Sequence, residues 1–322
     1  MSDDEGTRSL QAFCSRFGIE VEDDDDDVEE LDLSEKELAE LPPDLFEIDA
    51  FCDALKTLCL ERNQLRALPD ALGNLRAVTE LYLRENQLTS LPASIGQLQQ
   101  LDSLYLEDNK LTTEGIPDAM RTLSQLKGLC LHRNCLTSVP LSLLALTSLE
   151  ELYLDNNQIE SLPDEISQLV HLRELDMPGN RLKSLPKSFV QLAKLEILHL
   201  EGNCLETLPK GLGGLVALRK IYLQDNAITK LHASLGRCTK MEVINMENNK
   251  LTKVAKRIGD LPKLKHLLLA SNNIETLPFN PYEKAPGLRR LTLSGNKLAP
   301  DVLKLEHHVP LDAAIAEGDD EG

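Results

Sequence analysis

One leucine-rich segment recurs through most of this chain, and nearly every copy carries an asparagine at the same point. Successive asparagines are 23 residues apart, except for one gap of 25 and one of 24. A single short copy cannot bury its own apolar face, whereas stacked copies share a continuous core. The sequence therefore predicts a stack of coils with a ladder of asparagines, which are Asn63, Asn86, Asn109, Asn134, Asn157, Asn180, Asn203, Asn226, Asn249, Asn272 and Asn296.

The unit from Leu149 to His171 shows the shared pattern, which is LxxLxLxxNxLxxLPxxIxxLxx. The alternation in LxL has the period of a β-strand, so its leucines face inward. The asparagine follows that strand, where its buried amide can bond the open backbone of the turn and of the neighbouring coil. The Leu-Pro pair starts the return segment, because proline fixes φ where a short helix can begin. A twelfth, more divergent copy starts at Val28 and has Lys36 where the asparagine belongs.

This repeat resembles that of the leucine-rich-repeat superfamily, and within it the 23-residue subclass of Ras-suppressor-like and plant intracellular Ras-group-related proteins. The resemblance covers about residues 28 to 305. It implies an α/β fold, a right-handed solenoid curved like a horseshoe, with a parallel sheet on the concave side. Short helices or irregular turns would form the convex side. The resemblance also implies a scaffold or adaptor role in signalling, often around small GTPases or their kinases.

We expect three parts: an acidic N-terminal segment over 1–27, a solenoid of about 12 repeats over 28–305, and an acidic tail over 306–322. Residues 1–30 carry a net charge of −10, and residues 311–322 hold five acids and no base. The exposed end of a solenoid needs a cap. Apolar side chains on one helical face predict a capping helix over 8–19; they are Leu10, Phe13, Cys14, Phe17 and Ile19.

Several outer segments depart from the repeat. His232 and Ala255 replace the proline in two consecutive coils, so we expect the outer surface to differ there. Whether these coils form a second binding site is left open by the sequence. The last outer segment, 278–287, is too rich in proline and glycine for a regular helix.

The residue between the two inward leucines of LxL must point to the concave surface. Four of the five tyrosines of the chain occupy this single row, together with Asp176 and His199. Tyrosine among alternating charges is typical of a recognition surface, although tyrosine also simply suits an exposed strand position. We predict a partner-binding face formed by Tyr82, Tyr105, Tyr153, Tyr222, Arg84, Glu107, His132, Asp155, Asp176 and His199.

Charge changes sign along the predicted solenoid. Residues 31–170 carry a net charge of −13, and residues 171–310 carry +9. A basic C-terminal patch would receive an acidic partner and steer its approach, with ordinary solvated charge as the alternative. The acidic tails could also fold over that end. The patch comprises Arg219, Lys220, Lys265, His266, Arg289 and Arg290.

No group of residues predicts catalysis, a metal site or a cofactor. Cys130 and His199 could suggest a nucleophile and its base, but they lie three coils apart, about 14 Å by strand spacing. Asp176 and His199 fall on adjacent strands, where an ordinary surface contact is expected. No cysteine pair has the spacing of a zinc site, and no nucleotide-binding glycine motif occurs. We expect a protein that is not an enzyme.

Composition restricts the class of ligand that we expect and the cellular compartment in which we expect the protein. The basic coils lack interleaved aromatic residues, and the net charge of −19 argues against nucleic acid. No apolar run approaches the roughly 18 residues of a membrane span, and the acidic N-terminus is unlike a secretory signal. The seven cysteines are odd in number and irregularly spaced. They are expected to be reduced, as in the cytoplasm or nucleus.

These features favour a non-catalytic adaptor that holds a signalling protein, such as a small GTPase, kinase or phosphatase, across the concave tyrosines. One alternative is a regulatory subunit of an enzyme such as a phosphatase or ubiquitin ligase. Another is a structural component of a cytoskeletal or ciliary assembly. Each reading requires a protein partner.

Overall fold

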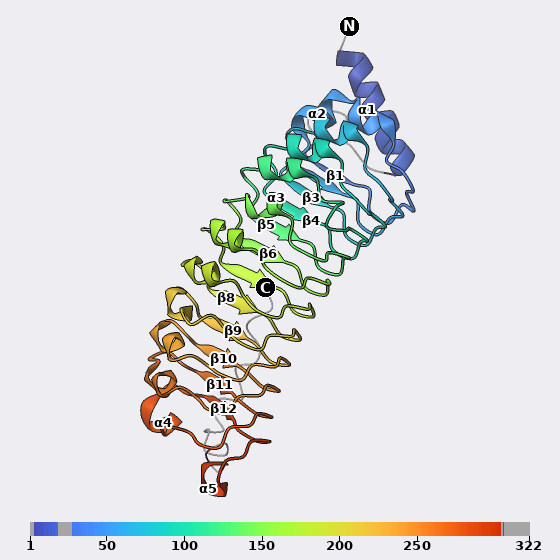
Figure 1. Cartoon of the computed structure of the whole chain (residues 1–322). Helices are drawn as coiled ribbons and strands as arrows, with labels where there is room; N and C mark the ends of the chain where they lie inside the picture. The colour runs from blue at the N-terminus through green and yellow to red at the C-terminus, as the bar shows by residue number, and fades with distance from the viewer. Residues whose placement is uncertain (1–2, 19–27, 304, 306–322) are drawn as a thin grey trace. The chain divides into compact units, whose positions relative to one another are not determined.

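The computed structural model describes residues 3–18, 28–303 and 305, and the chain divides into two units, Met1–Ile159 (unit 1) and Glu160–Gly322 (unit 2) (Figure 1). Residues 1–2 and 19–27 of the predicted acidic N-terminal segment, and the whole of the predicted acidic tail 306–322, lie outside the described residues. So does Ile19, the last residue of the expected capping helix.

Each unit contains six three-residue strands, paired in parallel with their sequence neighbours. In unit 1 the strands are β1 (Glu30–Asp32), β2 (Thr57–Cys59), β3 (Glu80–Tyr82), β4 (Ser103–Tyr105), β5 (Gly128–Cys130) and β6 (Glu151–Tyr153). In unit 2 they are β7 (Glu174–Asp176), β8 (Ile197–His199), β9 (Lys220–Tyr222), β10 (Val243–Asn245), β11 (His266–Leu268) and β12 (Arg290–Thr292).

Short helical turns connect the strands and stack beside one another in each unit, as Figure 1 shows. Unit 1 begins with a longer helix, α1 (Asp3–Phe17), which precedes β1. Its short helical turns are η1 (Pro43–Phe46), α2 (Asp49–Ala54), η2 (Asp70–Asn74), η3 (Ala93–Gln97), η4 (Asp118–Thr122) and α3 (Leu141–Leu144). Unit 2 has η5 (Asp164–Gln168), η6 (Lys187–Gln191), η7 (Leu212–Gly214), η8 (Ala233–Arg237), η9 (Lys256–Asp260), α4 (Pro281–Lys284) and α5 (Pro300–Leu303).

The core of each unit consists of the leucines of the repeat. The middle residue of every strand is almost wholly buried, as Leu81, Leu104 and Leu198 show, each with no exposed surface. The leucine, isoleucine or phenylalanine of the helical turn closes the same core from the other side; Ile95 and Phe189 are also fully buried. Parallel strands backed by short helices confirm the predicted fold class.

α1 covers the exposed end of the first coil. Its apolar side chains Leu10, Phe13 and Cys14 are buried, and the Phe13 ring meets the Phe51 ring of α2 edge-on at 5.1 Å between centroids. The helix begins at Asp3, five residues before the expected start at residue 8. Apolar periodicity marks only the buried part of a helix, so a polar first turn is invisible to it.

The outer segments differ from the sequence-based expectation in two places. Residues 281–284 form one helical turn, α4, because Pro281 stands at its first position and the Asn280 side chain accepts a hydrogen bond from the Tyr282 N–H. His232 and Ala255 take the extended backbone that proline takes elsewhere, with φ of −72° at both. The turns that follow them, η8 and η9, have the usual length. The expected change in the outer surface is therefore not in the backbone of these coils.

The ladder asparagines join each coil to its neighbour. Nδ2 of Asn109 donates to the carbonyl of Leu106 in its own coil at 3.1 Å and to that of Leu83 in the previous coil at 2.9 Å. Its Oδ1 accepts from the Leu88 N–H at 2.9 Å. Similar donations to backbone carbonyls recur at the other ten positions. Nine of the eleven side chains are buried, so their amides replace the water that these turns would otherwise need.

Replacing Asn109 by alanine tests the ladder. The change leaves three carbonyls and the Leu88 N–H without this partner in a buried turn, so we expect the free energy of unfolding to fall by about 1–3 kcal/mol. Urea unfolding followed by circular dichroism measures the loss. The matched control is Lys110→Ala, at the exposed next residue, which should change stability by less than about 0.5 kcal/mol. Equal stabilities of the two variants would contradict the ladder.

Candidate functional site

The strand face is the side of each sheet that carries the residues flanking the buried middle residue of the strands. Strand alternation puts the first and third residue of each strand on this side. In unit 1 the third residues include Tyr82, Tyr105 and Tyr153, which are half-buried rather than packed in the leucine core. In unit 2 they include His199 and Tyr222, also half-buried.

Two tyrosines of unit 1 form a stacked pair. Tyr82 and Tyr105 are register partners on β3 and β4, and their rings lie 4.5 Å apart with 6° between their planes. The Tyr82 hydroxyl donates to Glu80 Oε2 at 2.8 Å. Burial, followed by this hydrogen bond, raises the pKa of Tyr82 above its ordinary value. The phenol is therefore neutral at physiological pH and serves as a fixed apolar surface with one hydroxyl already bonded.

Tyr153 repeats the Tyr82 arrangement but stands apart from the stacked pair. Its hydroxyl donates to Glu151 Oε2 at 3.2 Å, and Cys130 lies between Tyr105 and Tyr153 in the register of the sheet. Because the cysteine side chain is smaller than a tyrosine ring, the surface is lower at Cys130 than at Tyr105 and Tyr153. Unit 1 thus presents an aromatic row with one gap.

A row of charged residues runs beside the tyrosines. Glu107 is buried, and burial raises the pKa of its carboxyl, although a hydrogen bond to its own backbone and the nearby His132 and Arg84 act in the opposite direction. Nε of Arg84 lies 3.5 Å from Oε1 of Glu61, and Nδ1 of His132 lies 3.7 Å from Oδ1 of Asp155. The alternating charges expected from the sequence thus contact one another across neighbouring strands.

In unit 2, His199 is the centre of a second cluster on the strand face. Its ring stacks on Tyr222 with 4.3 Å between centroids, and its Nδ1 lies 3.1 Å from Glu201 Oε1. Nε2 lies 3.9 Å from Asp176 Oδ1. Burial lowers the pKa of His199, but the Glu201 hydrogen bond and the Asp176 charge outweigh it and raise the pKa overall. The contact with Asp176 is of the ordinary kind expected for side chains on adjacent strands.

The same cluster contains the side chains best placed to hold a metal. Glu174, Asp176 and His199 each offer one ligand atom, and these atoms lie within 4.8 Å of one another. All three residues are half-buried, and both nitrogens of the His199 ring already face carboxylates. Ion pairing accounts for this geometry without a metal ion.

Part of the predicted basic patch is neutralised by acidic neighbours. Glu242 accepts hydrogen bonds from Arg219 Nε at 3.0 Å and Lys265 Nζ at 2.7 Å. Both bonds lower the pKa of the Glu242 carboxyl despite its partial burial, and the bond from Lys265 has the larger effect. Arg289 and Arg290 are exposed, whereas Lys220 and His266 are half-buried. The patch is therefore weaker than its sequence suggests.

Four carboxylates of these clusters were absent from the residues predicted as sites. Two belong to an ELY sequence that occurs at 80–82 and again at 151–153, where the alternation of a strand puts Glu and Tyr on one face. Glu174 is the first residue of β7 and lies two residues before Asp176 on the same face. Glu242 lies 23 residues from both Arg219 and Lys265, which is one repeat. Aligning the repeats by position would have revealed all four: Glu80, Glu151, Glu174 and Glu242.

Among the described residues, no helix has both the length and the apolar character needed to cross a membrane. What the strand faces offer is aromatic area with fixed carboxylates, groups that are suited to binding.

Comparisons with known proteins agree with this geometry. A family profile described as a leucine-rich repeat region matches residues 142–302, which is half of the chain, and one described as a leucine rich repeat matches 53–111. No curated protein matches.

Solved structures with the same architecture include bacterial and plant proteins. A leucine-rich-repeat protein of Leptospira interrogans is 28% identical, with a TM-score of 0.52, over 85% of this chain and 92% of that one. The ectodomain of the Arabidopsis thaliana receptor kinase GASSHO1/SCHENGEN3, solved with CASPARIAN STRIP INTEGRITY FACTOR 2, is 29% identical with a TM-score of 0.63; the match covers 83% of this chain and 35% of that one. A Listeria monocytogenes internalin is similar in fold, at 20% identity and a TM-score of 0.71, over 93% and 90% of the two chains.

Glu242→Gln tests the neutralisation of the basic patch. The folded state lowers the pKa of this carboxyl below its ordinary value of 4.5, so it binds fewer protons there than the unfolded chain does. The stabilisation is therefore present above pH 4.5 and is lost as the pH falls through the lowered folded value. At pH 7 we expect the variant to lose about 0.5–1 kcal/mol of unfolding free energy in urea titrations.

At pH 3 the stability difference between Glu242→Gln and the wild type should be smaller. Glu275→Gln, at an exposed carboxylate outside any ion pair of the described residues, is the control and should change little at either pH. A difference that is the same at both pH values would show that the carboxylate charge is not what stabilises this cluster.

Proposed function

The chain belongs to the leucine-rich repeat family, whose fold is generally a scaffold for protein–protein interactions, and from this premise we propose that it is a non-catalytic adaptor for a signalling protein. The partner would bind the strand face of unit 1. The Arabidopsis relative, solved with CASPARIAN STRIP INTEGRITY FACTOR 2, supports a binding role for repeats of this kind.

The observation that carries the proposal is the stacked pair of Tyr82 and Tyr105. Each ring is fixed by its partner at 4.5 Å, and the Tyr82 hydroxyl is fixed by Glu80. Side chains that are already ordered lose little conformational entropy when a partner binds. Tyrosine is also among the residues that contribute most to binding energy at interfaces.

Charge indicates what kind of partner surface would fit. Glu80 and Glu151 accept hydrogen bonds from the tyrosine hydroxyls, and Asp155, which is half-buried, lies near His132. Residues 31–170 carry a net charge of −13. A basic, partly apolar surface on the partner would complement this face and would approach it faster at low salt.

A small GTPase, a kinase or a phosphatase would be a suitable class of partner, and we place the complex inside the cell, in the cytoplasm or the nucleus. All seven cysteines are free, and Cys14, Cys130 and Cys238 are buried. Free thiols are typical of proteins in reducing compartments, which supports this location.

The proposal is tested by affinity capture from cell lysate followed by quantitative mass spectrometry. Tagged wild type is compared with the triple variant Tyr82→Ala/Tyr105→Ala/Tyr153→Ala. We expect at least one partner to be recovered roughly tenfold less by the triple variant, because each lost interface tyrosine costs about 1 kcal/mol or more. Higher salt should lower recovery of the same partner from the wild type.

The control variant is Leu141→Ala, which removes an apolar side chain that is 58% exposed on α3, away from the tyrosines. It should recover every partner as the wild type does. Circular dichroism checks that all variants are folded. Equal recovery of all partners by the triple variant would refute binding at the tyrosines while leaving the fold intact.

A further inference from the structure

The net positive charge of residues 171–310 lies on the helical side of unit 2 rather than on its strand face. Four consecutive outer segments contain η6, η7, η8 and η9; they are 183–195, 206–218, 229–241 and 252–264. Together they hold 11 lysines and arginines against two acids, whereas all other positions of 171–310 hold 11 of each. The corresponding segments of unit 1, which are 66–78, 89–101, 112–126 and 137–149, hold three of each.

Ion pairing separates the two sides further. On the strand side, Arg219 and Lys265 are bonded to Glu242. On the helical side, Lys183 is paired with Glu160, but the other ten cations are exposed and have no ion pair with another described residue. These ten are Lys187, Lys194, Lys210, Lys230, Arg237, Lys240, Lys253, Lys256, Arg257 and Lys263. Like charges crowded together without counter-charges cost stability, so a row of this kind suits an acidic ligand.

The helical side is hollowed where one turn is shortened. η7 contains three residues, Leu212–Gly214, whereas its neighbours η6 and η8 contain five each. The Gly214 N–H closes this turn on the Gly211 carbonyl at 2.8 Å. Neither glycine brings a side chain to the surface. The result is a hollow of about 730 Å³ between η7 and the turns that follow it.

Packing explains only part of this glycine run. A Cβ at Gly213 would lie 2.4 Å from the Ser234 carbonyl oxygen, and a Cβ at Gly214 would lie 2.5 Å from that of Val190, so the close approach of the coils requires both glycines. A Cβ at Gly211 would make only an ordinary contact with Val190 at 3.4 Å. Gly211 is therefore not required by packing, and its missing side chain leaves room in the hollow.

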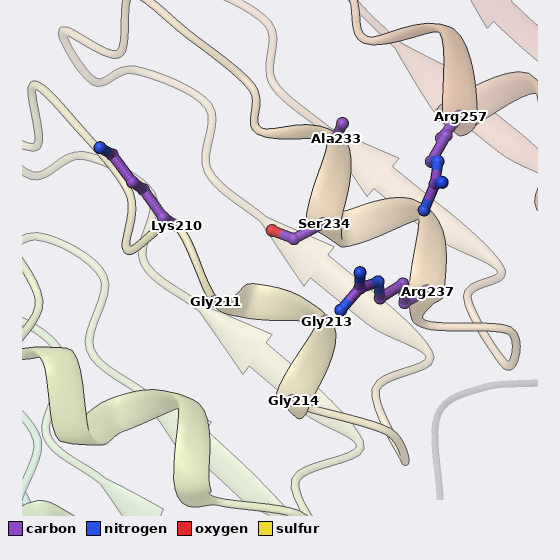
Figure 2. A pocket seen from close by; sticks show the side chains of 8 residues that line it. All are labelled: Lys210, Gly211, Gly213, Gly214, Ala233, Ser234, Arg237 and Arg257. Carbon is purple, nitrogen blue, oxygen red and sulfur yellow. The ribbon is translucent and has the colours of Figure 1, made fainter.

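The groups around the hollow are donors of hydrogen bonds and positive charge. Lys210, Arg237 and Arg257 line it, all from the unpaired set. In Figure 2, the Ser234 side chain lies between Lys210 on one side and the two arginines on the other. Ser234 Oγ is buried and has no hydrogen-bond partner among the described residues.

We propose that this hollow binds a phosphate group carried by a phosphorylated serine or threonine in an acidic segment of a partner protein. A phosphorylated side chain has a charge of about −1.5 to −2 and three acceptor oxygens. Two arginines and a lysine match that charge, and the guanidinium groups of Arg237 and Arg257 supply N–H donors to several oxygens at once. The flanking lysines of the outer segments would contact acidic residues on either side of the phosphate.

Two other polyanions fit the hollow less well. Single-stranded nucleic acid is usually held by aromatic stacking as well as charge, and no aromatic residue lines the hollow. A bilayer surface is broad and is usually anchored by inserted apolar side chains. The large exposed apolar side chains of unit 2, Val170 and Val216, are two single valines on separate coils.

The test uses fluorescence anisotropy with the full chain and a labelled acidic peptide that carries one phosphoserine. We expect the peptide to bind, its unphosphorylated form to bind roughly tenfold more weakly, and inorganic phosphate to compete. Arg237→Gln/Arg257→Gln should weaken phosphopeptide binding by roughly tenfold or more. The matched control is Arg289→Gln/Arg290→Gln, which removes two exposed charges on the strand side of the same unit. It should weaken binding by less than about threefold.

A second pair of variants addresses the hollow itself. Gly211→Glu places a carboxylate among the cations and should abolish phosphate-dependent binding, whereas Gly211→Ala should leave it within about twofold. The proposal is overturned if both arginine pairs weaken binding equally, if phosphorylation makes no difference, or if anionic vesicles bind while the phosphopeptide does not. Tyr82→Ala/Tyr105→Ala/Tyr153→Ala should not change phosphopeptide affinity, so this site stands or falls separately from the strand face.

Discussion

The hydrogen bonds between neighbouring coils are the constraint on which the rest of each unit depends. A three-residue strand cannot satisfy its own backbone, so its N–H and carbonyl groups pair with the strands on either side. Where the chain leaves the strand, the asparagine amide donates hydrogen bonds to backbone carbonyls of its own coil and of the previous coil. The residue before the asparagine must then turn with positive φ, as at Glu85 (53°) and Gly202 (63°). These bonds bring corresponding residues of successive repeats side by side.

Because the repeats lie side by side, residues at the same position of successive repeats, here called a column, form a continuous surface. One column places Tyr82 against Tyr105, and another places Glu242 between Arg219 and Lys265. On the helical side, four outer segments gather 11 lysines and arginines against two acids, and ten of these cations have no ion pair with another described residue. The two sides of unit 2 therefore differ in what they attract, although both arise from one repeat.

Much of this could be predicted from the sequence because the period of the repeat fixes both strand alternation and coil stacking. The leucine core, the asparagine positions and the outward row of tyrosines follow from that period alone. The start of α1 at Asp3 could not, because its polar first turn carries no apolar signal. Nor could the turn of α4, because the proline and glycine content of 278–287 argues against a helix, whereas Pro281 stands at the first position of one. The hollow beside η7 depends on how closely coils approach at Gly213 and Gly214, which sequence periodicity does not report.

We propose that the half-buried tyrosines of unit 1 form a contact surface and are not simply a consequence of strand geometry. Hydroxyl-radical footprinting of the protein with and without a captured partner measures this directly, because tyrosine and leucine side chains both oxidise when solvent reaches them. Oxidation of Tyr82, Tyr105 and Tyr153 should fall sharply in the complex while that of Leu141 stays the same. Unchanged oxidation at the three tyrosines, with protection at Leu141 instead, would contradict the account.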